Sequence, residues 1–256
     1  MINLLDYPLL VFALSFFVLW LAARLGATLL RRLRTPREDN REDLGTVLAA
    51  SLTLLGLIIG FSFSMAVSRY DQRKNYEEAE ANAIGTEYVR ADLLPAADAA
   101  KVRVLLRNYL EQRIAFYTTR DAQQIRQINV RTAQLQADLW SAITAPAAAQ
   151  PTPVMALVVS GMNEVLNSQG YTQAAWWNRI PAAAWALMAA IAVCCNLLVG
   201  YGARNARAEG TLFLILPFVV SISFFLIADI DSPSGGVIRV QAQNLTSLAG
   251  SLPANN

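Results

Sequence analysis

Four long runs without a charged residue constrain this 256-residue sequence more than any other feature. They cover residues 7–23, 44–68, 180–203 and 211–228. A helix needs about 20 mostly apolar residues to cross a bilayer, and the shortest run resumes after Arg24 as far as Leu30. One such run could be a core helix of a soluble protein, but four such runs in so short a chain cannot all be buried in a soluble core. The sequence predicts an all-α, multi-pass membrane protein with four transmembrane helices.

Most of the charged residues lie between the second and third runs. Apolar residues recur there with helical spacing, as at Val102, Leu106 and Tyr109, which predicts a helical extramembrane domain inserted between the second and third spans. The expected layout is a helix pair over 1–68, this domain over 69–178, a second pair over 179–228 and a tail over 229–256.

Three local signals define segments inside the expected domain. Residues 69–94 continue the second span as one long helix until Pro95, and the small residues at 79–85 would let another helix approach it. Thr152 and Pro153 are a typical N-cap and first residue of another helix. The Pro/Ala-rich stretch 145–153 predicts a linker.

Composition excludes several classes of protein. Charged residues make up only 16% of the chain, against about 25% in soluble domains. The chain has no histidine, and its two cysteines, Cys194 and Cys195, are adjacent, so His-based catalysis, a disulfide framework and the usual zinc sites are absent. We expect no enzyme and no cofactor. A net charge of +2 does not indicate nucleic-acid binding.

The second apolar run presents two patterned faces. Small residues recur at every fourth position, at Gly56, Gly60 and Ser64. An adjacent face carries Leu55, Ile59, Phe63 and Val67. The small face is typical of helix packing. The larger face would be lipid-facing or core surface in one interpretation. In the other, Ile59, Phe63 and Val67 from several subunits form a hydrophobic constriction of a pore.

Two acidic motifs are candidate ion sites. Asp229 and Asp231 follow the fourth span next to a Ser-Pro-Ser-Gly-Gly turn and could bind a hard cation, although two carboxylates are too few for calcium. The alternative is a solvated helix end. Upstream, Glu80, Ile84 and Glu87 share one helical face. This is either an ordinary charged face, with pairs such as Lys74 and Glu78, or a source of ion attraction at a vestibule.

Arginines in the short loops determine the expected orientation. The loops 31–43 and 202–210 contain Arg31, Arg32, Arg34, Arg37, Arg41, Arg204 and Arg207. The positive-inside rule therefore places these loops in the cytoplasm, with both termini and the helical domain outside.

Several stretches resemble one family of bacterial membrane proteins. These are residues 60–66, 69–73, 80–95 and the Asp-Ile-Asp-Ser-Pro-Ser-Gly-Gly stretch at 229–236, which together with the layout resemble the bestrophin-like domain family. The resemblance implies a distant kinship to bestrophins, which are pentameric anion channels of the membrane. It would give Ile59, Phe63 and Val67 the role of the pore neck, and Asp229 and Asp231 that of a reduced calcium clasp. Bestrophins keep the helical domain in the cytoplasm, opposite to the arginine count.

Three functions follow, in decreasing order of support. The first is a homo-oligomeric channel of the bacterial inner membrane that conducts inorganic anions, with Arg69 and Arg73 near the pore. The second is a membrane-anchored helical sensor or scaffold without conductance. The third is a membrane enzyme, for which the sequence offers no nucleophile or phosphate-binding motif.

Overall fold

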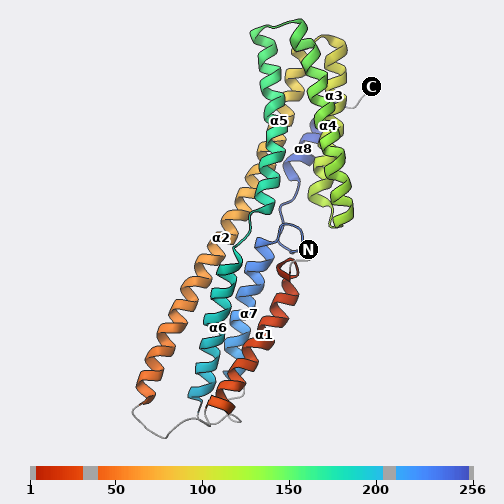
Figure 1. The fold of residues 1–256 in the computed structure, drawn as a ribbon. Coiled ribbons are helices and arrows are strands. Elements are labelled where there is room, and N and C mark those ends of the chain that lie inside the picture. Colours follow the sequence, from red (N-terminus) through yellow and green to blue (C-terminus); the bar gives the residue numbers. More distant parts are fainter. Residues whose placement is uncertain (1–3, 31–39, 204–211, 254–256) are drawn as a thin grey trace. The chain divides into compact units, whose positions relative to one another are not determined.

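The computed structural model describes residues 4–30, 40–203 and 212–253. The helices, shown in Figure 1, are α1 (Pro8–Leu25), α2 (Asn40–Arg90), α3 (Ala96–Thr118), α4 (Ala122–Ala149), α5 (Pro153–Trp177), α6 (Ala182–Gly202), α7 (Leu212–Asp231) and α8 (Gln243–Ser251). A π-helical segment, Gly26–Leu30, follows α1, and short 3-10 turns cover Leu4–Asp6 and Ala91–Leu93. The described residues contain no strand, which confirms the all-α prediction.

Four helical segments are long and apolar enough to cross a membrane, as predicted. They are α1, the first part of α2, α6 and α7. The chain divides into two compact units. The span unit comprises residues 1–69 and 179–239, and the helical unit comprises residues 70–178 and 240–256. Helix α2 contributes residues to both units.

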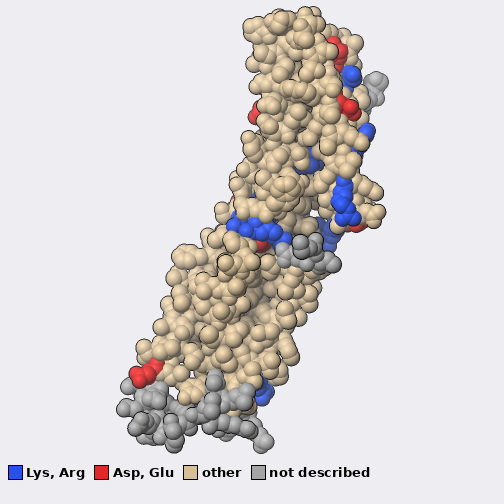
Figure 2. Space-filling model, in the orientation of Figure 1, with Lys and Arg blue, Asp and Glu red and all other residues tan. Residues whose placement is uncertain are grey.

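In the span unit, α1 packs against both α6 and α7 (Figure 1). The crossing of α1 and α6 is so close that a side chain would not fit. A Cβ atom on Gly26 would overlap the carbonyl oxygen of Leu197, and one on Gly200 would overlap that of Ala23. No sequence pattern distinguishes these glycines, because only the opposing backbone makes them necessary. Figure 2 shows no charged atoms on the visible surface of this unit between the ends of its helices.

The helical unit is a bundle with a continuous apolar core. Its fully buried residues include Ile84, Leu106, Leu139, Val158 and Leu245. Two predicted boundaries are confirmed: α2 ends at Arg90 shortly before Pro95, and α5 begins at Pro153. The hydroxyl of Thr152 accepts a hydrogen bond from the Met155 backbone N–H at 3.2 Å, as expected for an N-cap.

Two segments differ from the sequence-based expectation. The predicted linker 145–153 is mostly helix, because α4 continues through Pro146 to Ala149. Pro146 is buried, and its carbonyl accepts the Gln150 N–H, so alanine's high helix propensity and packing override the proline. In the expected tail, α8 was not predicted. It packs Leu248 against Gly85, where a Cβ would lie 3.0 Å from the leucine Cδ1. The small residues of α2 thus do admit another helix.

Candidate functional site

The apolar part of α2 is the least buried of the four spans. In its most apolar stretch, 6% of the residues are buried within the chain, against 28% for α1 and 50% for α7. Within 44–68, all of which the structure describes, the buried residues are Leu55, Ser62 and Ala66. One narrow stripe of the helix therefore contacts the rest of the chain, and a wide apolar surface does not.

The small face of α2 lies outside the buried stripe, whereas the larger face borders it, because Leu55 is itself buried. Phe63 is 41% exposed, and Ile59 and Val67 are half-buried. Gly56, Gly60 and Ser64 are exposed, and a Cβ on either glycine would have no atom within 4 Å. No helix of the same chain packs on these glycines in the described residues. That the small face packs against another helix stays a prediction, and the partner would have to be a helix of another chain. That the larger face lines a pore also stays a prediction.

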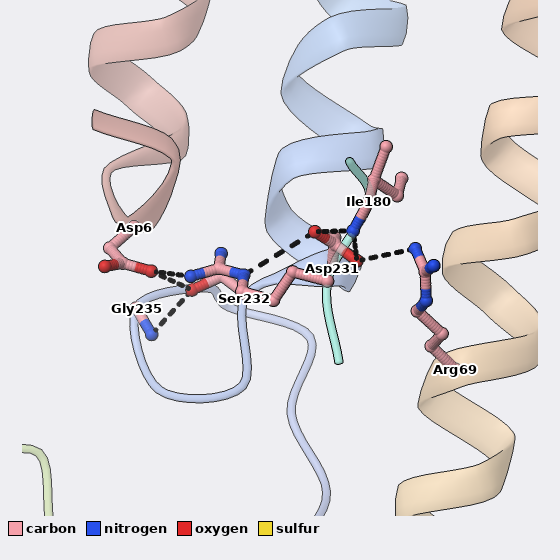
Figure 3. Close-up of polar contacts among 7 residues, drawn as sticks. Asp6, Arg69, Ile180, Asp231, Ser232 and Gly235 are labelled. Atoms are coloured by element: carbon pink, nitrogen blue, oxygen red, sulfur yellow. Dashed lines mark hydrogen bonds and ion pairs between the residues drawn. The ribbon is translucent and has the colours of Figure 1, made fainter. Parts of the chain in front are cut away.

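Asp231, at the end of α7, is the centre of an ionic cluster in the span unit (Figure 3). Its carboxylate is buried and accepts the Ile180 N–H at 3.2 and 3.3 Å. It lies 3.7 Å from Arg69 Nη1 and 3.6 Å from Arg179 Nε. Arg179 also donates to Asp6. The cluster joins the chain's beginning, α2, the start of α6 and the end of α7.

Asp229 holds the turn that follows α7. Its two carboxylate oxygens accept the backbone N–H groups of Val237 and Ile238, both at 2.8 Å, and its side chain is buried. A Cβ on Gly236 would overlap the Asp229 carbonyl oxygen, so glycine is needed there. The Ser232 hydroxyl accepts the Gly235 N–H at 3.1 Å in the same turn (Figure 3).

These contacts give the two aspartates a structural task. The carboxylate oxygens accept hydrogen bonds from backbone N–H groups or lie close to arginines. These N–H groups and arginines compete with a metal ion for the same oxygens. Among the described residues, no group of three or more His, Cys, Asp or Glu could hold a metal. The cation-binding prediction therefore gains no support from the geometry. The alternative of a solvated helix end was wrong, because both side chains are buried by contacts distant in sequence.

The acidic face of α2 is also buried, not an ordinary exposed face. Glu80 and Arg113 are both 0% exposed and form an ion pair through the Arg113 Nε and Nη2 groups. The Thr172 hydroxyl donates to Glu80 at 3.3 Å, and the Tyr117 hydroxyl lies at 3.5 Å. The Arg113 guanidinium is 4.6 Å from the centre of the Phe116 ring. Burial opposes the charge on Arg113, but the adjacent Glu80 raises its pKa above the ordinary value.

A second glutamate of this face caps α8. Glu77 accepts the Leu245 N–H at 3.0 Å and the side-chain amide of Asn244 at 2.6 Å. A carboxylate at a helix N-terminus accepts hydrogen bonds from otherwise unpaired N–H groups and interacts favourably with the helix dipole. Helical spacing places Glu77 on the face of Glu80 and Glu87, but it does not reveal these partners, because Asn244 lies 167 residues away in the chain.

The remaining predicted residues have varied positions. Arg69 belongs to the Asp231 cluster, and Arg73 is buried in the helical unit. Cys194 and Cys195 are free thiols. The loop arginines at 31–37, 204 and 207 lie outside the described residues, and so does the side chain of Arg41. The orientation predicted from them stays a prediction.

Solved structures share the fold of this chain. The chain is similar to a bacterial bestrophin homologue from Klebsiella pneumoniae, with a TM-score of 0.63 at 14% identity, over 94% of this chain and 99% of that one. Two single-substitution variants of that homologue give TM-scores of 0.64 and 0.62 at 13% identity. They cover 94% and 95% of this chain, and 97% and 98% of theirs. The fold is therefore that of the bacterial bestrophin homologues.

The family follows from the sequence itself. The model of the bestrophin-like domain matches residues 10–245, and the chain belongs to this family. The predicted resemblance is thereby confirmed over almost the whole chain. Among curated proteins, no sequence gives a significant match.

Proposed function

We propose that this protein is a homo-oligomeric ion channel of the bacterial inner membrane, which conducts inorganic anions through a pore lined by α2. The observation that carries the proposal is the exposure of α2, whose apolar surface contacts little of its own chain. A span with so little intrachain contact has lipid or other copies of the chain as neighbours. The family and the fold of the bestrophin homologues support the second choice.

The pore has to form between subunits. Close contacts between α1 and α6 at Gly26 and Gly200 leave no room for an ion at that crossing. Several copies of α2 around an axis would provide the route. By resemblance to bestrophins the number of copies is five, and Gly56, Gly60 and Ser64 would then let neighbouring helices approach closely.

The chemistry of α2 suits a hydrophobic neck. Residues 44–68 contain no ionisable group, which favours gating by dewetting and disfavours a proton-relay transporter. Ile59, Phe63 and Val67 would form the constriction. Arg69 and Arg73 follow the uncharged run on the same helix. Their positive charges, beside the end of the proposed pore, would attract anions toward it.

A phenylalanine pair on α2 provides the test. Phe63 belongs to the proposed neck, whereas Phe61 is 64% exposed and lies roughly 160° away around the helix. In planar bilayers, Phe63→Ala should change the unitary conductance by at least about twofold, because a narrow apolar constriction dominates the resistance of such a pore. Phe61→Ala should leave the conductance unchanged. Equal effects of the two substitutions, or no current from the parent protein, would contradict the proposal.

The alternative is a membrane-anchored sensor or scaffold. A groove of about 400 Å³ in the helical unit supports it, lined in part by Tyr76, Ser160, Asn163, Glu164 and Tyr171. This alternative predicts a monomer or dimer in several detergents and no conductance. A molar mass near five times 28.0 kDa by light scattering, after subtraction of detergent, would favour the channel. We do not propose catalytic activity, since the chain contains no histidine and no recognisable nucleophile motif.

A further inference from the structure

Glu87 differs from the other two buried glutamates on the inner face of α2. Glu77 and Glu80 both accept hydrogen bonds from N–H donors. Glu87 is 0% exposed, yet neither of its carboxylate oxygens has a hydrogen-bond partner. An ionised carboxylate without donors is costly in a protein interior, and a neutral carboxyl group is far less so.

Helix α5 is shaped to receive this side chain. Gly161 of α5 faces Glu87, and a Cβ there would overlap Glu87 Oε2 and Arg90 Nη1. The Glu87 carboxyl group therefore occupies the space that a side chain at position 161 would fill. Met162 and Val158 of α5, next to Gly161 on the helix, are fully buried in the core of the helical unit. Glu87 itself is 0% exposed, so its carboxyl group is out of contact with bulk water.

The charged groups around Glu87 do not neutralise it by direct contact. Arg90, on the same helix, favours the ionised form, and Glu164 of α5 opposes it. Nearby, Arg103 of α3 is paired with Asp92 and lies over the Tyr88 ring. Burial is the largest influence and raises the pKa of Glu87 to about 8. The described residues offer no third ligand for a metal ion.

We propose that Glu87 is a proton-binding site of the helical unit, occupied at neutral pH, and that loss of the proton loosens the packing of α2 on α5. The geometry that carries the proposal is a fully buried carboxyl group without donors, held in a space that only glycine leaves open. The site does not depend on channel function. It requires only that the helical unit is folded.

Infrared spectroscopy of the purified full chain in detergent tests the site directly. We would titrate from about pH 5 to about pH 10 and follow the carbonyl band of protonated carboxyl groups, which disappears as they ionise. The band should titrate near pH 8 in the parent protein and be missing in Glu87→Gln. Glu78→Gln, at an exposed position of the same helix, should leave it unchanged.

Two neighbouring substitutions keep the test decisive even if Glu87→Gln does not fold. Arg90→Gln removes the cation and should raise the midpoint, whereas Glu164→Gln removes a like charge and should lower it. Shifts in these opposite directions identify the titrating group as Glu87. A midpoint below about 6, no band at neutral pH, or midpoints that do not respond would show that Glu87 is ionised and paired, and would overturn the proposal.

Discussion

The Glu80–Arg113 ion pair makes a strong prediction about stability. Both side chains are fully buried, and their elements, α2 and α3, meet in the core of the helical unit. Replacing Arg113 with Met retains much of the apolar volume but leaves the Glu80 carboxylate without its cation. We expect Arg113→Met to lower the free energy of unfolding by about 3–5 kcal/mol, because an uncompensated buried charge remains.

The double variant Glu80→Leu/Arg113→Met should be less damaging than the single one. It removes both charges, so the desolvation penalty disappears together with the attraction. The Tyr117 and Thr172 hydroxyls then lose their acceptor, at about 1 kcal/mol each. We expect the double variant to lie within about 2 kcal/mol of the parent protein.

Urea unfolding in mild detergent, followed by tryptophan fluorescence, would measure these differences. Trp176 is a suitable reporter, since its ring is 4.4 Å from Phe116 and 6.0 Å from Tyr117. Arg126→Met is the matched control, because Arg126 is exposed on α4, and its cost should stay within about 0.5 kcal/mol. If Arg113→Met were as mild as this control, the buried ion pair would not exist as described.

Further predictions concern the glycines, the aspartates and pH. Gly161→Ala should destabilise the helical unit by about 1–3 kcal/mol, whereas Gly170→Ala on the same helix, with open space around it, should be neutral or stabilising in the same unfolding assay. Gly200→Ala should lower the thermal midpoint of the full chain, while Gly60→Ala should alter only the oligomer mass measured by light scattering. Millimolar calcium should leave the melting temperature unchanged, because the oxygens of Asp229 and Asp231 are engaged; a clear rise would reinstate the cation site. The folded state retains a proton on Glu87 that the unfolded state loses above about pH 4.5. The free energy of unfolding should therefore fall as the pH rises from about 4.5 to about 8, by at most about 1.4 kcal/mol per pH unit. Glu87→Gln should abolish this slope.

The sequence by itself determined the membrane class, the four spans and the family. A span is recognisable locally because a bilayer requires a sufficient length of uncharged residues, whatever their neighbours are. The same holds for the Thr152 cap and the stop before Pro95, which depend on backbone chemistry within a few residues. The pattern of α2 likewise showed which residues share a face.

Only the tertiary structure decided what each face meets. Helical periodicity placed Glu80 and Glu87 together, but the partner of Glu80 is 33 residues away and Glu87 has none. Arg113 lies at helical spacing from Leu106 and Tyr109, which indicates burial, but this spacing does not reveal its partner. Asp6 and Arg179 are 173 residues apart, so no local pattern could join them. A carboxylate or a glycine acquires its role from the donor or backbone that packing brings against it, and sequence spacing does not contain that information.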